Sequence, residues 1–227
     1  MVFVILPLVT RPCLFWGSEL LDRVVVILGI LIAFTGQSLR LLVIGYVYVK
    51  RGGKNRRIYA DKLVVEGFYA HTRNPMYVGN FLITVGVGIT YGSPWIYFFV
   101  IPFFSFVYVS IVMAEETFLR GKFGREYEEY EKQVNRFVPN FRGIKNSLKD
   151  FRYDWKRALR KDYGTICGTL FGILIINVWK TYYLYGFQAR KGEIVTLALL
   201  FIPLGLLYAL MSYLKSSGRL VSPGSDL

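Results

Sequence analysis

Residues 76–114 read MYVGNFLITVGVGITYGSPWIYFFVIPFFSFVYVSIVMA, two apolar stretches joined by Gly92-Ser93-Pro94. Each stretch approaches or meets the roughly 20 apolar residues that a helix needs to cross the hydrocarbon core of a membrane. Three residues leave room only for a tight turn, and Pro94 suits the first turn of the helix that follows. This part of the chain therefore predicts an antiparallel helical hairpin in a membrane.

Further apolar stretches lie on both sides of the hairpin, at residues 24–49, 164–185 and 194–214, and residues 1–16 are a shorter candidate. The fold class that we predict is an all-α polytopic membrane helical bundle with five or six membrane helices. The stretch at 1–16 has no basic start and no small-residue cleavage pattern, so we expect a retained short or re-entrant helix rather than a signal peptide.

We expect three parts along the chain: N-terminal membrane helices at 1–50, a core with the hairpin at 51–150, and an appended C-terminal helical hairpin at 151–227. Within the core, Tyr127, Tyr130 and Val134 recur at helical spacing between charged residues. This pattern predicts a cytoplasmic amphipathic helix. Residues 145–162 are more polar and are expected to connect it to the last hairpin at the membrane surface.

The net charge of +13 comes from basic residues that lie mainly between the apolar stretches. Seven of the 28 Lys and Arg lie in residues 50–73, thirteen in 120–161 and two after Leu214. If the helices alternate in direction, these segments share one side, which the positive-inside rule makes cytoplasmic. Anionic lipid head groups account for such charge, so we expect a multi-pass membrane protein with no nucleic-acid partner.

Cys13 and Cys167 lie in or beside apolar stretches without metal-type spacing, and His71 is the single histidine. We therefore expect neither a disulfide framework nor a metal site.

Two motifs lie at the ends of the hairpin. Residues 67–79 read GFYAHTRNPMYVG, and Glu115-Glu116 is followed by Phe123-Gly124-x-x-Tyr127-x-x-Tyr130. Because a hairpin brings its ends together, Arg73 to Tyr77 should meet the paired glutamates at the cytoplasmic face, where a polar cofactor can enter.

In their order, these motifs resemble the isoprenylcysteine carboxyl methyltransferases and the related phospholipid N-methyltransferases, over residues 63–140. The family pattern has a histidine between the arginine and the proline, whereas this chain has Asn74. Asn-Pro-Met-Tyr is similar to the phospholipid methyltransferase version, and an asparagine still donates and accepts hydrogen bonds. The helices after residue 150 are absent from the minimal family core.

The resemblance implies an S-adenosylmethionine pocket on the cytoplasmic side and a membrane lipid or lipidated small molecule as substrate. It implies catalytic roles for Arg73 and Glu116. It also implies that the cofactor contacts are His71, Asn74, Pro75, Met76, Tyr77, Gly79, Glu115, Glu116, Tyr127 and Tyr130. Carboxyl O-methylation of an isoprenylcysteine-like compound is the first reading, and phospholipid amine N-methylation is the second.

Other readings stay open. A membrane reductase of the sterol-reductase kind shares a similar hairpin motif but uses NADPH, and a helical scaffold would bind neither cofactor. Taken alone, Arg73 is an interface anchor, Asn74-Pro75 is a helix start, and Tyr127 and Tyr130 are packing aromatics.

Arg40 lies about ten residues inside the cytoplasmic end of the stretch at 24–49, with Gln37 one turn earlier on the same face. An unpaired guanidinium at such depth costs roughly 2.5–3.5 kcal/mol even on insertion scales. No acidic residue is expected deep inside another apolar stretch. Arg40 therefore either snorkels to the interface, pairs with a glutamate, or binds an anionic group of the substrate, and we list it as substrate-binding. Gly86-Val87-Gly88 is expected to permit close helix packing.

Overall fold

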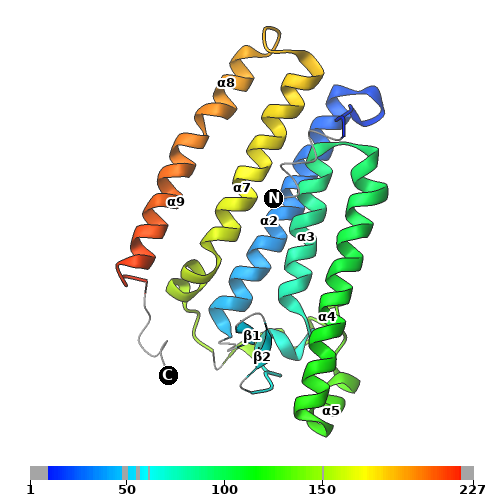
Figure 1. The fold of residues 1–227 in the computed structure, drawn as a ribbon, viewed down its shortest axis with the longest axis vertical. Helices are drawn as coiled ribbons and strands as arrows, with labels where there is room; N and C mark the ends of the chain where they lie inside the picture. Colours follow the sequence, from blue (N-terminus) through cyan, green and yellow to red (C-terminus); the bar gives the residue numbers. More distant parts are fainter. Residues whose placement is uncertain (1–9, 48–50, 55–56, 61, 150, 221–227) are drawn as a thin grey trace.

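The computed structural model describes residues 10–47, 51–54, 57–60, 62–149 and 151–220. Long helices run side by side along the long axis of the molecule, from α9 at one edge to α4 at the other (Figure 1). The helices are α2 (Glu19–Tyr46), α3 (Pro75–Tyr91), α4 (Ile101–Phe123), α5 (Arg125–Gln133), α6 (Ile144–Leu148), α7 (Trp155–Tyr185), α8 (Lys191–Leu199) and α9 (Phe201–Ser216). Three short helical turns complete them: η1 (Phe15–Gly17), η2 (Gly67–Ala70) and η3 (Ile96–Val100).

Four helical segments of the described chain are long and apolar enough to cross a membrane: Glu19–Tyr46, Ile96–Phe123, Trp155–Tyr185 and Lys191–Ser216. Their outward faces carry large apolar side chains that no other element covers, such as Phe98, Phe106 and Leu206. Contiguous exposed apolar surface of this kind is typical of contact with lipid. The prediction of a multi-pass membrane protein is supported by these four segments.

The described chain has four of the five or six membrane helices that the sequence predicts. α3 has 17 residues, which gives about 26 Å at 1.5 Å per residue and falls short of a full crossing. The predicted helix at residues 1–16 falls largely outside the described residues. Its last part, from Thr10, contains only the single turn η1.

The predicted helical fold is confirmed with one exception. The class was predicted as all-α, but the described chain also contains two short strands. Strands β1 (Arg51–Lys54) and β2 (Arg57–Ala60) pair antiparallel, with Arg51 opposite Ala60. The sequence of this segment is too polar and glycine-containing for a membrane helix, and it forms a small hairpin beyond the end of α2 (Figure 1).

The segment after the central hairpin also differs in detail from the prediction. The amphipathic pattern corresponds to α5, which buries Tyr127 and Tyr130 but ends at Gln133, because Val134 already has extended backbone. The segment expected as a surface connection at 145–162 contains most of α6 and becomes helical again at Trp155, where the Asp154 side chain accepts a hydrogen bond from the Arg157 amide. That N-cap starts α7 nine residues before the predicted apolar stretch.

Glycines bring the backbones of α2 and α3 into direct contact. A Cβ atom added to Gly36 would lie 2.6 Å from the Gly79 carbonyl oxygen, and one added to Gly29 would lie 2.7 Å from that of Gly86. The two pairs are each seven residues apart, so the same faces meet over two turns. The prediction that Gly86 permits close helix packing is confirmed, and small residues at membrane helix contacts act in this way.

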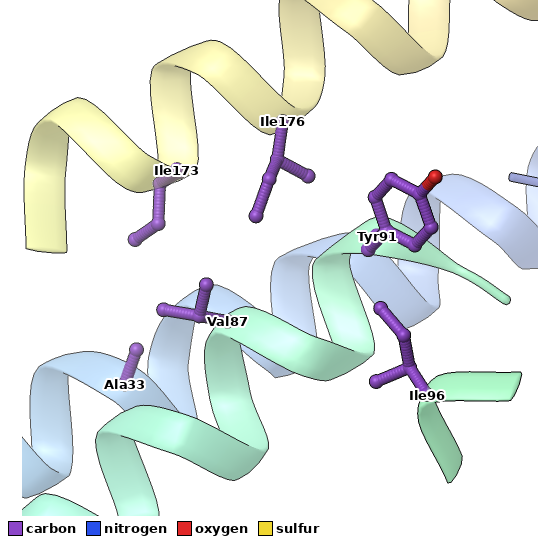
Figure 2. Close-up of a cluster of buried hydrophobic side chains, with 6 residues drawn as sticks. All are labelled: Ala33, Val87, Tyr91, Ile96, Ile173 and Ile176. Atoms are coloured by element: carbon purple, nitrogen blue, oxygen red, sulfur yellow. The ribbon is translucent and has the colours of Figure 1, made fainter. Parts of the chain in front are cut away.

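α7 packs against this pair and closes the core. Figure 2 shows that Ala33 of α2 and Val87 and Tyr91 of α3 lie beneath Ile173 and Ile176 of α7, with Ile96 of η3 beside them. These residues are between 0% and 7% exposed, so they form a buried apolar cluster that joins α2, α3 and α7.

Two buried ion pairs join α2 to α7. Near one end Arg40 pairs with Asp162, and near the other the Lys180 ammonium lies 2.7 Å from Asp22 Oδ1. The pairs are 18 residues apart on each helix, which is about 27 Å along the axis. The antiparallel helices are therefore tied at two levels separated by nearly the thickness of a hydrocarbon core.

Figure 1 shows the β hairpin and α5 at one end of the molecule, and α9 runs towards the same end. This arrangement gives a test of the predicted topology, in a background without Cys13 and Cys167. We expect cysteines placed at Glu129 and Ser217 to react with a membrane-impermeant maleimide from the same side of sealed vesicles. A cysteine at Gln188, in the turn between α7 and α8, should react from the other side. Labelling of Glu129 and Ser217 positions from opposite sides would contradict the topology.

Candidate active site

The start of α3 is held by backbone contacts to a distant segment. The Arg73 amide donates to the Asn135 carbonyl at 2.9 Å, and the Thr72 hydroxyl donates to the Arg136 carbonyl at 3.2 Å. Asn74 occupies the N-cap position and Pro75 the first turn, as the sequence predicts, but the Asn74 side chain does not cap the helix. The side-chain amide of Asn74 instead donates a hydrogen bond to the buried Glu116 carboxylate.

The interior beside the start of α3 is organised around Glu116, which is 2% exposed. Arg73 donates from Nε to Oε1 at 3.1 Å and from Nη2 to Oε2 at 3.4 Å. Asn74 Nδ2 adds a bond to Oε1 at 2.9 Å, and Arg136 Nε adds one to Oε2 at 2.9 Å. The predicted meeting of the two ends of the hairpin is confirmed, and it takes the form of a buried ion-pair network.

Glu131 extends the network towards the surface. Arg73 Nη1 donates to its backbone carbonyl at 2.9 Å, and Arg120 Nη2 donates to its carboxylate at 2.6 Å. The hydrogen bond from Arg120 holds the pKa of the Glu131 carboxyl below its ordinary value, and the charges of Arg120 and Arg73 act in the same direction. Glu131 therefore stays ionised as a second partner of Arg73.

A cavity of about 380 Å³ lies beside this network, within the size range of small-molecule sites. Helices α2, α3, α4 and α7 all contribute to its wall. The lining residues are Arg40, Val43, Ile44, Val47, Tyr69, Arg73, Asn74, Met76, Tyr77, Asn80, Glu115, Arg157, Lys161 and Asp162. The lining combines polar and charged side chains with the aliphatic Val43, Ile44 and Val47.

Five of the residues expected at the cofactor site or as catalytic line this cavity: Arg73, Asn74, Met76, Tyr77 and Glu115. The Tyr77 hydroxyl donates to Glu115 Oε1 at 2.8 Å, which fixes the carboxylate at the wall. Asn74 is 2% exposed, and its Oδ1 is a buried acceptor with no partner among the described residues. Such an orphaned atom in a cavity wall is a natural place for a ligand donor.

The other residues expected at the cofactor site do not line the cavity. Glu116, Pro75, Gly79, Tyr127, Tyr130 and His71 are not among the lining residues. The Tyr130 hydroxyl donates to the carbonyl of Tyr69, at 2.7 Å, and Tyr127 packs beside it. His71 is buried, with Nδ1 at the Asn140 carbonyl and Nε2 2.9 Å from Ser147 Oγ, so it anchors the segment that follows α5.

Gly79 makes room for a side chain of the neighbouring helix α2. A Cβ there would lie 2.6 Å from Arg40 Cγ, so the missing side chain lets Arg40 cross the surface of α3.

Arg40 lines the cavity, but the expectation that no acidic residue lies inside another membrane helix is wrong, because Asp162 of α7 is its partner. It makes a two-pronged contact with Asp162, with Nε 3.2 Å from Oδ2 and Nη2 at Oδ1. Asn80 accepts from Nη1, and Gln37 Nε2 donates to Asp162 Oδ2 at 2.5 Å. The error has a simple origin: the apolar stretch was taken to begin at residue 164, whereas α7 begins two turns before Asp162.

Sequence reasoning also missed Asn80, Tyr69, Arg136, Arg157 and Lys161. Asn80 is one turn beyond Met76 on α3, and its spacing to Tyr77 could have placed it on the same face. Arg157 donates to the Ile44 and Gly45 carbonyls at 2.9 and 2.7 Å, and so closes the C-terminal end of α2. No local pattern could have shown that contact, because it joins residues more than 110 positions apart.

Two comparisons with known proteins found similar sequences. The family model described as phospholipid methyltransferase matches residues 23–126, from α2 to the first turn of α5. The chain is also 35% identical, over 81 residues, to the protein-S-isoprenylcysteine O-methyltransferase of Schizosaccharomyces pombe. That alignment covers 34% of this chain and 33% of the relative, so the chain spans about a third of its length. No solved structure matches the chain.

Both matches are to methyltransferases, which confirms the resemblance carried by the motifs. The residues that the family model matches include Arg73, Asn74, Tyr77 and both glutamates, and they exclude all of α7 to α9.

Proposed function

We propose that this chain is an integral membrane methyltransferase that transfers a methyl group from S-adenosylmethionine to a lipid-like acceptor. The observation that carries the proposal is the cavity wall at the open end of the central hairpin, where Arg73, Asn74, Tyr77 and Glu115 converge. It is supported by two matches to methyltransferases, of which the family model, over residues 23–126, covers this wall apart from α7.

The wall fits the chemical groups of the proposed cofactor. S-adenosylmethionine supplies an electrophilic methyl group on a sulfonium, and it also carries an ammonium, a carboxylate and ribose hydroxyls. Glu115 and the orphaned Asn74 Oδ1 are acceptors for its donors. Arg73 uses three of its five N–H groups in the bonds described above, which leaves donors for a carboxylate.

The work of the protein in such a transfer is positioning. The cofactor would supply its methyl carbon to an acceptor oxygen held in line with the carbon–sulfur bond, and the electron pair of that bond would remain on sulfur. A carboxylate acceptor needs no general base, so alignment and exclusion of water account for the catalysis. On this proposal Arg73 and Glu116 act as a pair, in which the buried carboxylate holds the guanidinium at the cavity wall.

The charge of the wall favours carboxyl O-methylation of an isoprenylcysteine-like compound over N-methylation of a phospholipid amine. Among the described lining residues, Arg40, Arg73, Arg157 and Lys161 outnumber Glu115 and Asp162. Basic side chains at the wall attract a carboxylate and repel an ammonium. Phospholipid N-methylation stays as the second candidate, because the matching family model carries that description and Asn74 replaces the histidine of the other pattern.

Calorimetry with purified protein in detergent tests the class of enzyme. We expect S-adenosylmethionine to bind at one site and NADPH to give no heat above dilution. Methyl transfer would then be measured with a radiolabelled methyl group, with an N-acetylated S-prenylcysteine as one acceptor and phosphatidylethanolamine as the other. Binding of NADPH in place of S-adenosylmethionine would support the reductase reading, and binding of neither would remove the proposal.

A further inference from the structure

Helix α7 lies outside the residues that match the methyltransferase family model, yet it forms part of the cavity wall. Arg157, Lys161 and Asp162 all line the cavity from its first two turns. A polar wall contributed by an appended helix is unexpected if that helix serves only to anchor the chain. Polar and charged groups inside membrane segments mark functional cavities more often than lipid contacts.

Asp162 is fully buried, and the contacts described for its two carboxylate oxygens are all to α2. Oδ1 accepts from Arg40 Nη2, and Oδ2 accepts from Arg40 Nε and Gln37 Nε2. The carboxylate therefore faces Arg40, and its contribution to the cavity is made through that guanidinium.

The Arg40 side chain, which belongs to α2, is held by residues of two neighbouring helices. Asp162 and Thr165 of α7 take Nε and Nη2, and Asn80 of α3 takes one N–H of Nη1. Four of the five N–H groups are thus occupied by the described residues, and the fifth, on Nη1, is left on a side chain that lines the cavity. A planar guanidinium locked in this way presents its remaining donor with little conformational freedom to lose.

Arg40 lies deeper in the helical bundle than the end of α2. It lies six residues before the end of α2 at Tyr46, about 9 Å further into the helical bundle. The groups assigned to the cofactor, Asn74, Tyr77 and Glu115, belong to the start of α3 and the late part of α4.

We infer that α7 completes an acceptor subsite in which Asp162 is a positioning residue. It holds Arg40 so that the guanidinium binds an anionic group of the acceptor, a carboxylate or a phosphate. This inference rests on the proposed function and gives the appended C-terminal helices a role in substrate recognition rather than in cofactor binding.

The test uses variants that remove charge in pairs, since removal of one member leaves a buried charge without its partner. The first is Arg40→Gln with Asp162→Asn, which keeps polar groups of similar shape. The matched control is Asp22→Asn with Lys180→Gln, which removes the other α2–α7 ion pair far from the cavity. A third variant, Asp162→Glu, keeps the charge and shifts it by one methylene.

Three quantities are measured for each protein: the affinity for S-adenosylmethionine, the KM for the acceptor, and direct binding of the acceptor without cofactor. The acceptors are the S-prenylcysteine, which carries a carboxylate, and phosphatidylethanolamine, which carries a phosphate. For the Arg40/Asp162 variant we expect at least a tenfold rise in KM and in the acceptor dissociation constant, with cofactor affinity within twofold of wild type. The acceptor that shows this rise identifies the anionic group.

The control variant should keep the acceptor KM within twofold, and Asp162→Glu, which keeps both charges of the pair, should raise the acceptor KM less than the Arg40/Asp162 variant does. The inference is overturned if the Arg40/Asp162 variant, folded by its thermal midpoint, keeps the wild-type acceptor KM, or if its cofactor affinity falls in step. An equal loss in the control variant would show that α7 acts only through general packing. Failure of the proposed function is distinct, because the wild-type protein would then bind no S-adenosylmethionine and transfer no methyl group.

Discussion

Glu116→Ala is expected to destabilise the protein by about 3–5 kcal/mol, the usual cost of removing one partner of a buried ion pair. The reason is the network at its carboxylate, where Arg73, Asn74 and Arg136 all donate to oxygens that are almost fully buried. Without them the Arg73 guanidinium stays buried with only the more exposed Glu131 as a charged partner. Thermal unfolding in detergent, followed by circular dichroism, should show a midpoint lower by roughly 10 °C.

The neighbouring glutamate provides a matched control on the same helix. Glu115 lines the cavity and is half-buried, with a hydrogen bond from Tyr77. We expect Glu115→Ala to change stability by no more than about 1 kcal/mol and to weaken S-adenosylmethionine binding by roughly tenfold or more, the loss of a hydrogen bond to a charged group. The division of roles would be contradicted if Glu116→Ala kept wild-type stability while Glu115→Ala lost it.

Gly86→Leu is expected to prevent α2 and α3 from packing as they do. A Cβ at this position would overlap the backbone of Gly29 and Ala33, and backbone atoms cannot rotate away as a side chain can. Overpacking of flexible neighbours costs about 1–3 kcal/mol, so we expect a loss of at least about 3 kcal/mol here. The measurements are the yield of monodisperse protein after size-exclusion chromatography and the thermal midpoint.

Gly168→Leu on α7 is the control, because a Cβ added there meets nothing within 4 Å. It introduces the same side chain into another apolar helix and should leave yield and midpoint near wild type. Equal losses in both variants would mean that the cost comes from the leucine itself and not from the α2–α3 contact.

Hydrophobic patterning predicted the elements that bury or expose apolar surface. The turn at Gly92 falls where expected, since Gly92 has φ of 71°, a conformation that glycine adopts without strain. The meeting of Arg73 with the paired glutamates followed from the geometry of a hairpin, which converts distance in sequence into proximity in space. The distinction between Glu115 at the cavity and Glu116 behind it did not follow, because adjacent residues on a helix differ by about 100° in direction and the pattern does not show which one faces inward.

The contacts that the sequence could not show are those between helices far apart in the chain. Asp162 looked like part of a polar connection because its nearest neighbours in sequence are basic. Only the docking of α7 against α2 turns that position into a buried partner of Arg40. Similarly, Asn74 was expected to cap its own helix, and the buried carboxylate of Glu116 takes its amide instead.

The two ion pairs between α2 and α7 bear on how the protein is assembled in the membrane. α7 is the least apolar of the four candidate spans, with a mean hydropathy of 1.3 against 2.0 for α2. On its own, α7 would expose Asp162 and Lys180 to lipid near the two sides of the membrane. The complementary charges, Arg40 and Asp22, lie on α2 at the same spacing. During synthesis α2 is made first, so it can serve as a template that draws α7 into the bilayer in a single register. Residues 151–227 would consequently be a poor candidate for a free-standing membrane module, although they follow the family-matched residues 23–126 in the linear chain.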